Sequence, residues 1–188
     1  MSQIRSIALF SGSSMGNTEH YLLAARSLAK AMAARNLSLV YGGGNLGLMG
    51  AAAEILYKNG NAVTAVLPSF FDTPAVRTHR VESEMIITET MHERKAIMYA
   101  QSDAFIALPG GVGTFEELLE CITWKQLGLH HKPIALYNTA SFYDPLLSFL
   151  THSANEGFIQ AALLDSLIVE SDAEVLFDRL ISFGSLQQ

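Results

Sequence analysis

The sequence predicts an α/β protein with a Rossmann-like, doubly wound parallel sheet flanked by helices. Short apolar runs alternate along the chain with segments in which apolar residues recur every three or four positions, the pattern of strands followed by helices. The apolar runs contain few polar residues, which is typical of parallel strands that are buried on both faces. Glycine and polar residues directly follow several runs, and in such a sheet these positions meet at the edge where ligands bind.

Length and composition narrow the class of protein. The 188 residues suffice for one sizeable core, so residues 1–188 are expected to form a single domain. The net charge of −6 argues against a nucleic-acid-binding surface, and no apolar run approaches the ~18 residues of a membrane span. Cys121 is the only cysteine, and no signal-peptide pattern is present, so a cytoplasmic location is expected. Cys121 is expected to pack as a small apolar residue, with a catalytic thiol as the alternative.

The first third of the chain is expected to alternate as strand, helix, strand, helix and strand. Asn17 or Thr18 is a plausible N-cap of the first helix, and Asn59-Gly60 is the stop signal of the second. The expected elements are Ile4–Phe10, Tyr21–Met32, Leu37–Tyr41, Leu48–Tyr57 and Ala62–Leu67, and Pro68 closes the third strand.

The remainder begins with a less regular segment, Ser69–Glu84, which is expected to be a long loop and therefore a functional one. Strands and helices then alternate again, with Glu89 or Thr90 as the cap of the next helix. The expected strands are Met85–Thr88, Ala104–Leu108, Pro133–Tyr137 and Leu167–Val169. The expected helices are Met91–Ala100, Thr114–Leu127, Tyr143–Glu156 and Asp172–Phe183, with Asp144-Pro145 as the alternative start of the third.

The strongest functional signal is the stretch Phe105–Glu117, which is typical of a strand, a glycine loop and a helix. The loop Pro109-Gly110-Gly111-Val112-Gly113-Thr114 allows backbone N–H groups to converge on an anion at the positive end of the helix dipole. Glu116, Glu117 and Glu120 follow, so acids stand beside a phosphate-friendly loop. The alternative for Glu117 is a capping box, in which Thr114 is the N-cap and Glu117 bonds back to it.

A second glycine loop, Gly42-Gly43-Gly44-Asn45-Leu46-Gly47, matches G-x-G-x-x-G between a strand and a helix. The acidic residue that normally binds a ribose hydroxyl about 20 residues further on is absent, since the next strand ends at Leu67-Pro68. The pattern therefore favours a loop for some nucleotide or phosphate over a nicotinamide cofactor. Tight turns alone remain the structural alternative.

Two cations occupy an unfavourable place at the start of the expected helix from Met91. The helix dipole disfavours positive charge there, so Arg94 and Lys95 need an anionic partner, such as a phosphate or Glu117. Arg94 is the better candidate because a guanidinium holds two oxygens at once. A solvated charged face is the alternative. No histidine set has the spacing of metal ligands, so no metal and no other cofactor is expected.

These motifs together resemble one known family. Pro109–Glu117 matches the signature P-G-G-x-G-T-x-x-E, and Met91–Lys95 matches the accompanying M-x-x-R-K element. Further matches are Tyr41–Gly44, Gly47–Gly50 and Trp124–Gly128. The chain is similar to the LOG family of cytokinin riboside 5′-monophosphate phosphoribohydrolases, long labelled "lysine decarboxylase-like". It departs from the family at Ser11, where many relatives carry cysteine, and across Ser69–Glu84.

The resemblance implies a single nucleotide-binding Rossmann-like domain over residues 1–188, a homodimer, and a nucleoside monophosphate as substrate. The implied reaction is hydrolysis of the N-glycosidic bond of AMP or an N6-substituted AMP, giving the free base and ribose 5-phosphate. Arg94 and Glu117 are the implied catalytic residues. The expected substrate-binding residues are Ser13, Gly43, Gly44, Met91, Lys95, Gly110, Gly111, Gly113 and Thr114, of which Gly111, Gly113 and Thr114 would hold phosphate.

The residues agree with this chemistry, since a carboxylate beside the sugar carbon stabilises the positive charge that builds there and can orient or deprotonate water. Glu117 is the expected carboxylate, and Arg94 would position phosphate or keep Glu117 ionised. One alternative is a non-catalytic nucleotide-binding or carrier module of the same fold. Another is the older decarboxylase label, which normally requires a lysine Schiff base with pyridoxal phosphate, and Lys95 is the only lysine near the expected site.

Overall fold

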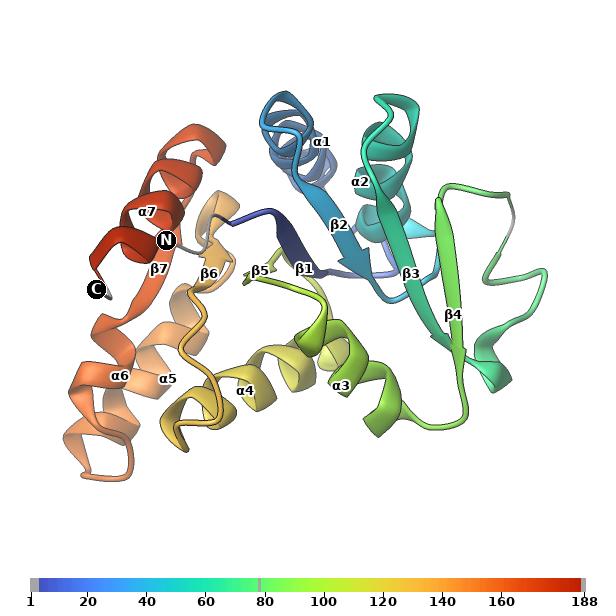
Figure 1. Ribbon diagram of the computed structural model, residues 1–188. Coiled ribbons are helices and arrows are strands. Elements are labelled where there is room, and N and C mark those ends of the chain that lie inside the picture. The colour runs from blue at the N-terminus through green and yellow to red at the C-terminus, as the bar shows by residue number, and fades with distance from the viewer. Residues whose placement is uncertain (1–3, 78, 187–188) are drawn as a thin grey trace.

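Residues 4–77 and 79–186 are described by the computed structural model, and their strands form one seven-stranded parallel sheet (Figure 1). The strand order is β4-β3-β2-β1-β5-β6-β7, which is the doubly wound arrangement that the sequence predicts. The strands are β1 (Ser6–Phe10), β2 (Ser38–Tyr41), β3 (Val63–Pro68), β4 (Glu84–Thr88), β5 (Ala104–Ala107), β6 (Ile134–Tyr137) and β7 (Leu167–Glu170).

The direction of winding changes between two central strands. β1 pairs with β2 on one side, where Leu9 lies opposite Tyr41, and with β5 on the other, where Phe10 lies opposite Ala107. The chain leaves β1 toward β2 and leaves β5 toward β6, so the segments that follow these two neighbouring strands diverge. A crevice opens at such a switch point, at the carboxyl ends of the strands, and this is where open α/β sheets bind ligands.

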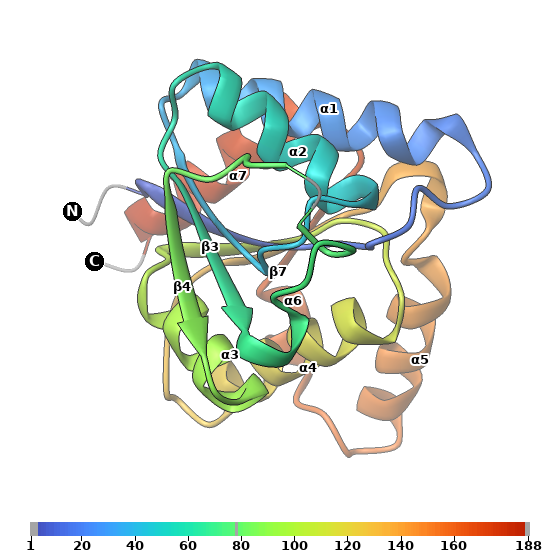
Figure 2. The same ribbon diagram turned by 90° about the vertical axis from the view of Figure 1, so that its right-hand side faces the viewer.

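Helices cover both faces of the sheet (Figures 1 and 2). One face carries α1 (Glu19–Ala34), α2 (Gly47–Lys58) and α7 (Ala173–Leu186). The opposite face carries α3 (Met91–Ala100), α4 (Val112–Gln126), α5 (Asp144–Asn155) and α6 (Ala161–Asp165).

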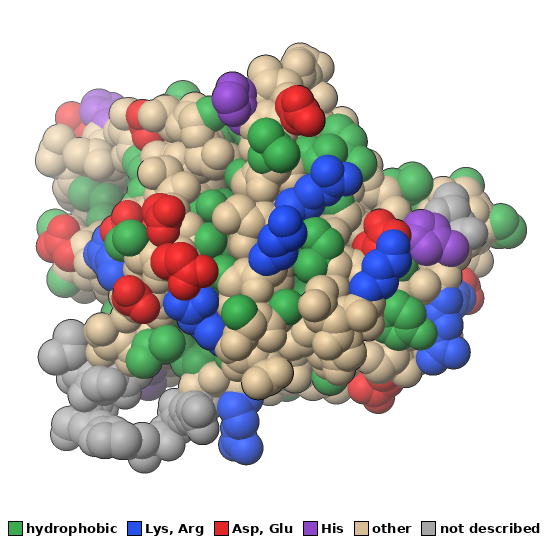
Figure 3. All heavy atoms as spheres, turned by 90° about the horizontal axis from the view of Figure 1, so that it is seen from above, with side chains coloured by type: hydrophobic (Ala, Val, Ile, Leu, Met, Phe, Trp, Pro, Cys, Tyr) green, Lys and Arg blue, Asp and Glu red, His purple; other side chains and the backbone are tan. Residues whose placement is uncertain are grey.

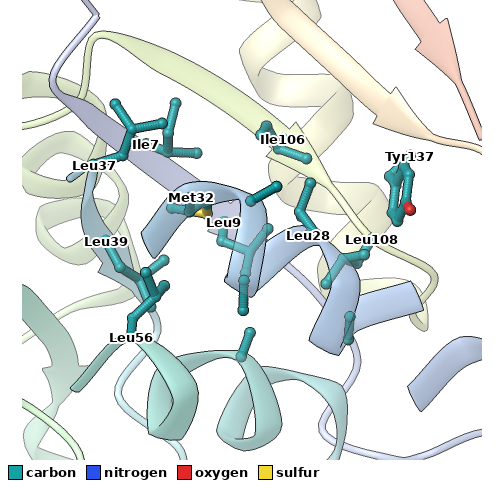
Figure 4. Packing of buried hydrophobic residues seen from close by; sticks show 14 of the residues in the cluster. Ile7, Leu9, Leu28, Met32, Leu37, Leu39, Leu56, Ile106, Leu108 and Tyr137 are labelled. Atoms are coloured by element: carbon teal, nitrogen blue, oxygen red, sulfur yellow. The ribbon is translucent and has the colours of Figure 1, made fainter. Parts of the chain in front are cut away.

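The core lies in two layers because successive strand residues point to opposite faces of the sheet. Ile7 and Leu9 of β1 face α1 and α2, whereas Ala8 and Phe10 face α4 and α5. Burying a leucine- or isoleucine-sized side chain contributes about 1.5–3 kcal/mol, so the alternation fixes the register of β1. Figure 4 shows the first layer, with Leu28, Met32 and Leu56 of the helices against Ile7, Leu9, Leu39 and Ile106 of the strands.

Most expected elements are confirmed, with boundaries that differ by at most three residues, and the helix Met91–Ala100 agrees at both ends. The segment after β3 is the expected irregular stretch, apart from a short 3-10 helix at Ser69–Phe71. The sequence missed α6, because a five-residue helix is too short to show helical periodicity. The expected start of the fourth helix at Thr114 is wrong, since α4 begins at Val112 with Gly111 as its N-cap.

The caps of two helices agree with the sequence. Thr90 caps α3 through a capping box, in which its hydroxyl accepts from the Glu93 N–H at 3.1 Å and the Glu93 carboxylate accepts from the Thr90 N–H. Thr18 occupies the N-cap position of α1 but makes no side-chain hydrogen bond there. The capping box therefore fixes where α3 starts, and with it the direction in which Arg94 points.

The surface over α1, α2 and α7 carries acidic and basic side chains that are interspersed rather than separated (Figure 3). None of the helices in the described part of the chain is long and apolar enough to cross a membrane.

Gly47, the first residue of α2, is a point of close approach between two loops. Its φ is +62°, and a Cβ at this position would overlap the backbone of Ser13 and Ser14. Gly60 after α2 has a similar φ of +81° but open space around it. Substitutions at these two positions can therefore distinguish the free-energy cost of a left-handed backbone, which both share, from the cost of a steric clash, which only Gly47 would have.

We expect Gly47→Ala to lower the free energy of unfolding by about 2–4 kcal/mol, since it adds a clash to left-handed strain. Gly60→Ala, the matched control, should cost only about 1–2 kcal/mol. Urea denaturation followed by circular dichroism measures both. Equal losses would show that the Ser13 contact does not require glycine.

Candidate active site

A cleft of about 460 Å³ opens at the carboxyl ends of the central strands. This volume falls within the range of small-molecule sites. Its polar walls come from the segments that follow β1, β2 and β5 and from the first turns of α3 and α4. The residues of these walls are Ser11, Gly12 and Ser13, Gly42 and Gly44, Met91 and Arg94, and Gly111, Gly113, Thr114 and Glu117.

An ion pair between Arg94 and Glu117 lies in this cleft. Nη2 of Arg94 is 2.7 Å from Oε1 of Glu117, and the two side chains are only 11% and 9% exposed. Nε of Arg94 donates a hydrogen bond to the carbonyl of Val66 at 3.2 Å. Gly42 makes room for the guanidinium, because a Cβ at that position would overlap it. The structure therefore brings together the two motifs from which the sequence predicted catalysis.

The groups around Glu117 shift the pKa of its carboxyl in opposite directions. Burial raises the pKa of the carboxyl above its ordinary value, and the Arg94 guanidinium counteracts that rise. Farther charges act more weakly, since Glu116 raises the same pKa and Lys95 lowers it. Because the pKa is raised in the folded protein, Glu117 holds its proton to higher pH than an exposed glutamate and becomes an anion as pH rises through that value.

The start of α4 has the geometry that the predicted anion site requires. Gly111 is the N-cap, so the N–H groups of Val112, Gly113 and Thr114 belong to the first turn, where no carbonyl of the helix reaches them. The capping-box interpretation of Thr114 and Glu117 is therefore wrong, because Thr114 lies inside the helix and the Glu117 carboxylate binds Arg94. Free N–H groups and the positive helix end together suit a phosphate.

The cleft brings together most of the expected substrate-binding residues. Gly43 and Gly110 do not line it. Gly43 has a φ of +81° and sits against Leu67, and a Cβ on Gly110 would overlap the Thr114 hydroxyl. Both glycines thus shape the loops that border the cleft without lining the cleft themselves. The expected residues that do line the cleft are Ser13, Gly44, Met91, Gly111, Gly113 and Thr114, with Arg94 and Glu117.

Lys95 lies outside the cleft, between α3 and α4. Its side chain is buried, and Nζ donates to the carboxylates of Glu116 and Glu120, the latter at 3.1 Å. The Tyr99 hydroxyl also donates to Glu120, at 2.9 Å. Lys95 thus has its anionic partners within the protein, which the residue pattern alone did not reveal because three neighbouring glutamates were available.

Four apolar side chains of the cleft were not singled out individually from the sequence. They are Met49, Leu67, Phe71 and Val76, the last two from the long loop after β3 that was expected to be functional. Ser11, which directly follows β1, also lines the cleft, and its Oγ is buried and has no hydrogen-bond partner among the described residues.

Cys121 packs in the core as the sequence predicts. It is buried among the side chains between the sheet and α4, and burial raises the pKa of its thiol well above the ordinary value. A thiol with a raised pKa is a poor nucleophile at neutral pH. Within the described residues, no three His, Cys, Asp or Glu side chains come together as a metal site would require.

Fold and cleft together define a Rossmann-like α/β protein in which an anion-binding helix end faces a buried arginine–carboxylate pair. A family model described as "Possible lysine decarboxylase" matches residues 49–180. A protein of Oryza sativa subsp. japonica named "Probable cytokinin riboside 5′-monophosphate phosphoribohydrolase" is 46% identical over 95% of this chain and 84% of its own length. A cytokinin riboside 5′-monophosphate phosphoribohydrolase of Arabidopsis thaliana is 45% identical over the same shares. The chain belongs to this phosphoribohydrolase family, the LOG family.

The fold also occurs in more distant proteins. The Moco carrier protein from Chlamydomonas reinhardtii superimposes with a TM-score of 0.71, covering 97% of this chain and 99% of that chain, at 21% sequence identity. At this level of identity the likeness concerns the fold alone.

We expect the charges around Glu117 to move its pKa in opposite directions. Lys95→Met removes a cation and frees two carboxylates, so it should raise the pKa of Glu117, whereas Glu116→Gln should lower it. Titration of the carboxyl carbon by NMR measures the pKa, and Glu174→Gln on α7 is the control that should leave it unchanged. Shifts of the same sign in both variants would contradict this assignment.

Proposed function

We propose that the protein hydrolyses the N-glycosidic bond of a cytokinin riboside 5′-monophosphate, or of AMP, to give the free base and ribose 5-phosphate. The buried Arg94–Glu117 pair, set between an anion-binding helix end and an apolar wall, carries this proposal. The names of relatives that are 45–46% identical over 95% of the chain support the same reaction.

The proposed orientation of the nucleotide follows from the chemistry of the cleft. Its phosphate binds the first-turn N–H groups of Gly113 and Thr114 at the start of α4. The ribose then lies beside Glu117, one helical turn further on, and the base lies toward Phe71 and Val76. Arg94 stands next to Glu117, where its charge holds the carboxylate in place.

The proposed reaction breaks the bond between the sugar carbon C1′ and the base nitrogen. The bonding electrons leave with the base, which takes up a proton, and positive charge develops on the sugar. The Glu117 carboxylate stabilises that charge and accepts a proton from the water whose oxygen bonds to C1′. Because this role requires the anion, activity should rise with pH through the raised pKa of Glu117.

The decarboxylase description of the family model has less support. A pyridoxal enzyme needs a lysine at its cofactor, and no lysine is among the described residues that line the cleft. Lys95, the nearest candidate, donates to Glu116 and Glu120 instead. A Schiff base there would break the ion pairs of the buried Lys95 with Glu116 and Glu120.

The domain organisation, the location and the oligomeric state of the protein are also proposed. One continuous sheet carries every strand of the described residues, which supports a single nucleotide-binding domain over residues 1–188. The lone buried Cys121 fits a cytoplasmic location. Leu119, Leu127 and Leu129 are exposed on and after α4, which supports a homodimer that covers them.

We expect Glu117→Gln to lower kcat by about 10²–10⁴-fold, the scale for losing a general acid–base group, because an amide neither carries the charge nor accepts the proton. Release of ribose 5-phosphate from AMP and N6-isopentenyl-AMP measures this. The control, Arg179→Met, removes an exposed ion pair with Glu170 on the other side of the sheet and should retain full activity. If Glu117→Gln matches the wild type, the assignment of Glu117 is wrong. Saturable nucleotide binding without turnover by the wild type would instead support a carrier.

We expect the protein in solution to have twice the mass of its 20.4 kDa chain, because the exposed leucines require cover. Light scattering after size-exclusion chromatography measures this. A Leu127→Asp/Leu129→Asp variant should elute as a monomer. A monomeric wild type at micromolar concentration would contradict the homodimer.

A further inference from the structure

The residues Ser69–Arg77, here called the cleft loop, supply part of the apolar end of the cleft. Phe71 and Val76 of this loop line the cavity. Phe71 is 46% exposed, so part of its surface is available to a ligand. Aromatic side chains of this kind stack on nucleotide bases.

Arg77 holds the cleft loop together at the two residues that matter for the cavity. It directly follows Val76, and its Nη1 is 2.8 Å from Oδ1 of Asp72, the residue after Phe71. The backbone N–H groups of Val76 and Arg77 both donate to the carbonyl of Thr73, at 3.0 and 2.9 Å. The loop is thereby folded back on itself, with Phe71 and Val76 at the two ends of the turn.

The same guanidinium anchors the cleft loop to the body of the protein. Nη2 of Arg77 is 3.3 Å from Oε1 of Glu82, whose side chain is only 5% exposed. The other carboxylate oxygen of Glu82 accepts from the N–H of Val81 at 2.9 Å, so Glu82 is a fixed point. The Asn45 N–H also donates to the carbonyl of Val76 at 3.2 Å, which joins the loop to the glycine loop after β2.

We propose that Arg77 is a positioning residue for base recognition, because it clamps Asp72 to Glu82 and so fixes Phe71 and Val76 at the apolar end of the cleft. The inference rests on the proposed function in one respect, that a nucleotide base lies at this end. Arg77 itself does not line the cleft, so it acts through Phe71 and Val76. Its removal affects the base and leaves the phosphate end of the cleft as it is.

Calorimetric titration with two ligands tests this, because ribose 5-phosphate contains the sugar and phosphate of AMP but no base. Both are titrated into proteins that carry Glu117→Gln, which should slow turnover about 10²–10⁴-fold and so keep AMP intact during the titration. Adding Arg77→Met should weaken AMP binding about three- to tenfold, the range for losing partly exposed charged contacts, and leave ribose 5-phosphate binding unchanged. Arg77→Lys should restore only part of the affinity for AMP, because one ammonium cannot join both carboxylates as the two guanidinium nitrogens do. Arg179→Met, which removes an ion pair far from the cleft, should change neither.

A second set of variants excludes a general loss of folding. Asp72→Asn cuts the clamp at its other end and should reproduce the pattern of Arg77→Met. Phe71→Ala should weaken AMP binding by itself, and adding Arg77→Met to it should cost less than Arg77→Met alone, because the two residues act on one contact. Additive losses, or equal losses of AMP and ribose 5-phosphate, would overturn the proposal. Failure of the wild type to release ribose 5-phosphate would instead refute the proposed function. The comparison of AMP with ribose 5-phosphate binding would still test the role of Arg77 in that case.

Discussion

The buried contact between Arg94 and Glu117 is the interaction on which the site depends. Removing one partner of a buried ion pair costs about 3–5 kcal/mol, so α3 and α4 must approach each other with both side chains in place. Neighbouring residues serve this approach. Gly42 leaves space for the guanidinium, Val66 accepts its Nε–H, and Lys95 joins the same two helices on the side away from the cleft.

The arrangement divides the cleft into regions of different chemistry. The cleft combines backbone N–H groups at the start of α4, a carboxylate whose burial opposes its ionisation, and apolar side chains. The proposed orientation of the nucleotide assigns the phosphate, the sugar and the base to these surroundings in turn. The proposed substrate thus accounts for the cleft as a whole, which none of its individual motifs indicates.

The sequence predicted the fold closely, because buried parallel strands are apolar throughout and most of them are followed by a segment with clear helical periodicity. It also predicted that Arg94 and Glu117 work together. What it could not provide depends on three-dimensional packing. The N-cap of α4 is a glycine, whereas a threonine three residues later offered the more conventional signal. The partners of Lys95 could not be chosen among three adjacent glutamates, and the apolar residues of an irregular loop gave no periodicity that could place them in the cleft.

The capping box at Thr90 determines which cation reaches the cleft. Successive residues of a helix point about 100° apart, so Arg94 turns to Glu117 while Lys95 turns to Glu116 and Glu120. Deleting one residue between Thr90 and Glu93 would bring Lys95 to the position that Arg94 now occupies, and inserting one there would bring Glu93 to it. The spacing between the capping threonine and the guanidinium therefore decides which charge meets Glu117.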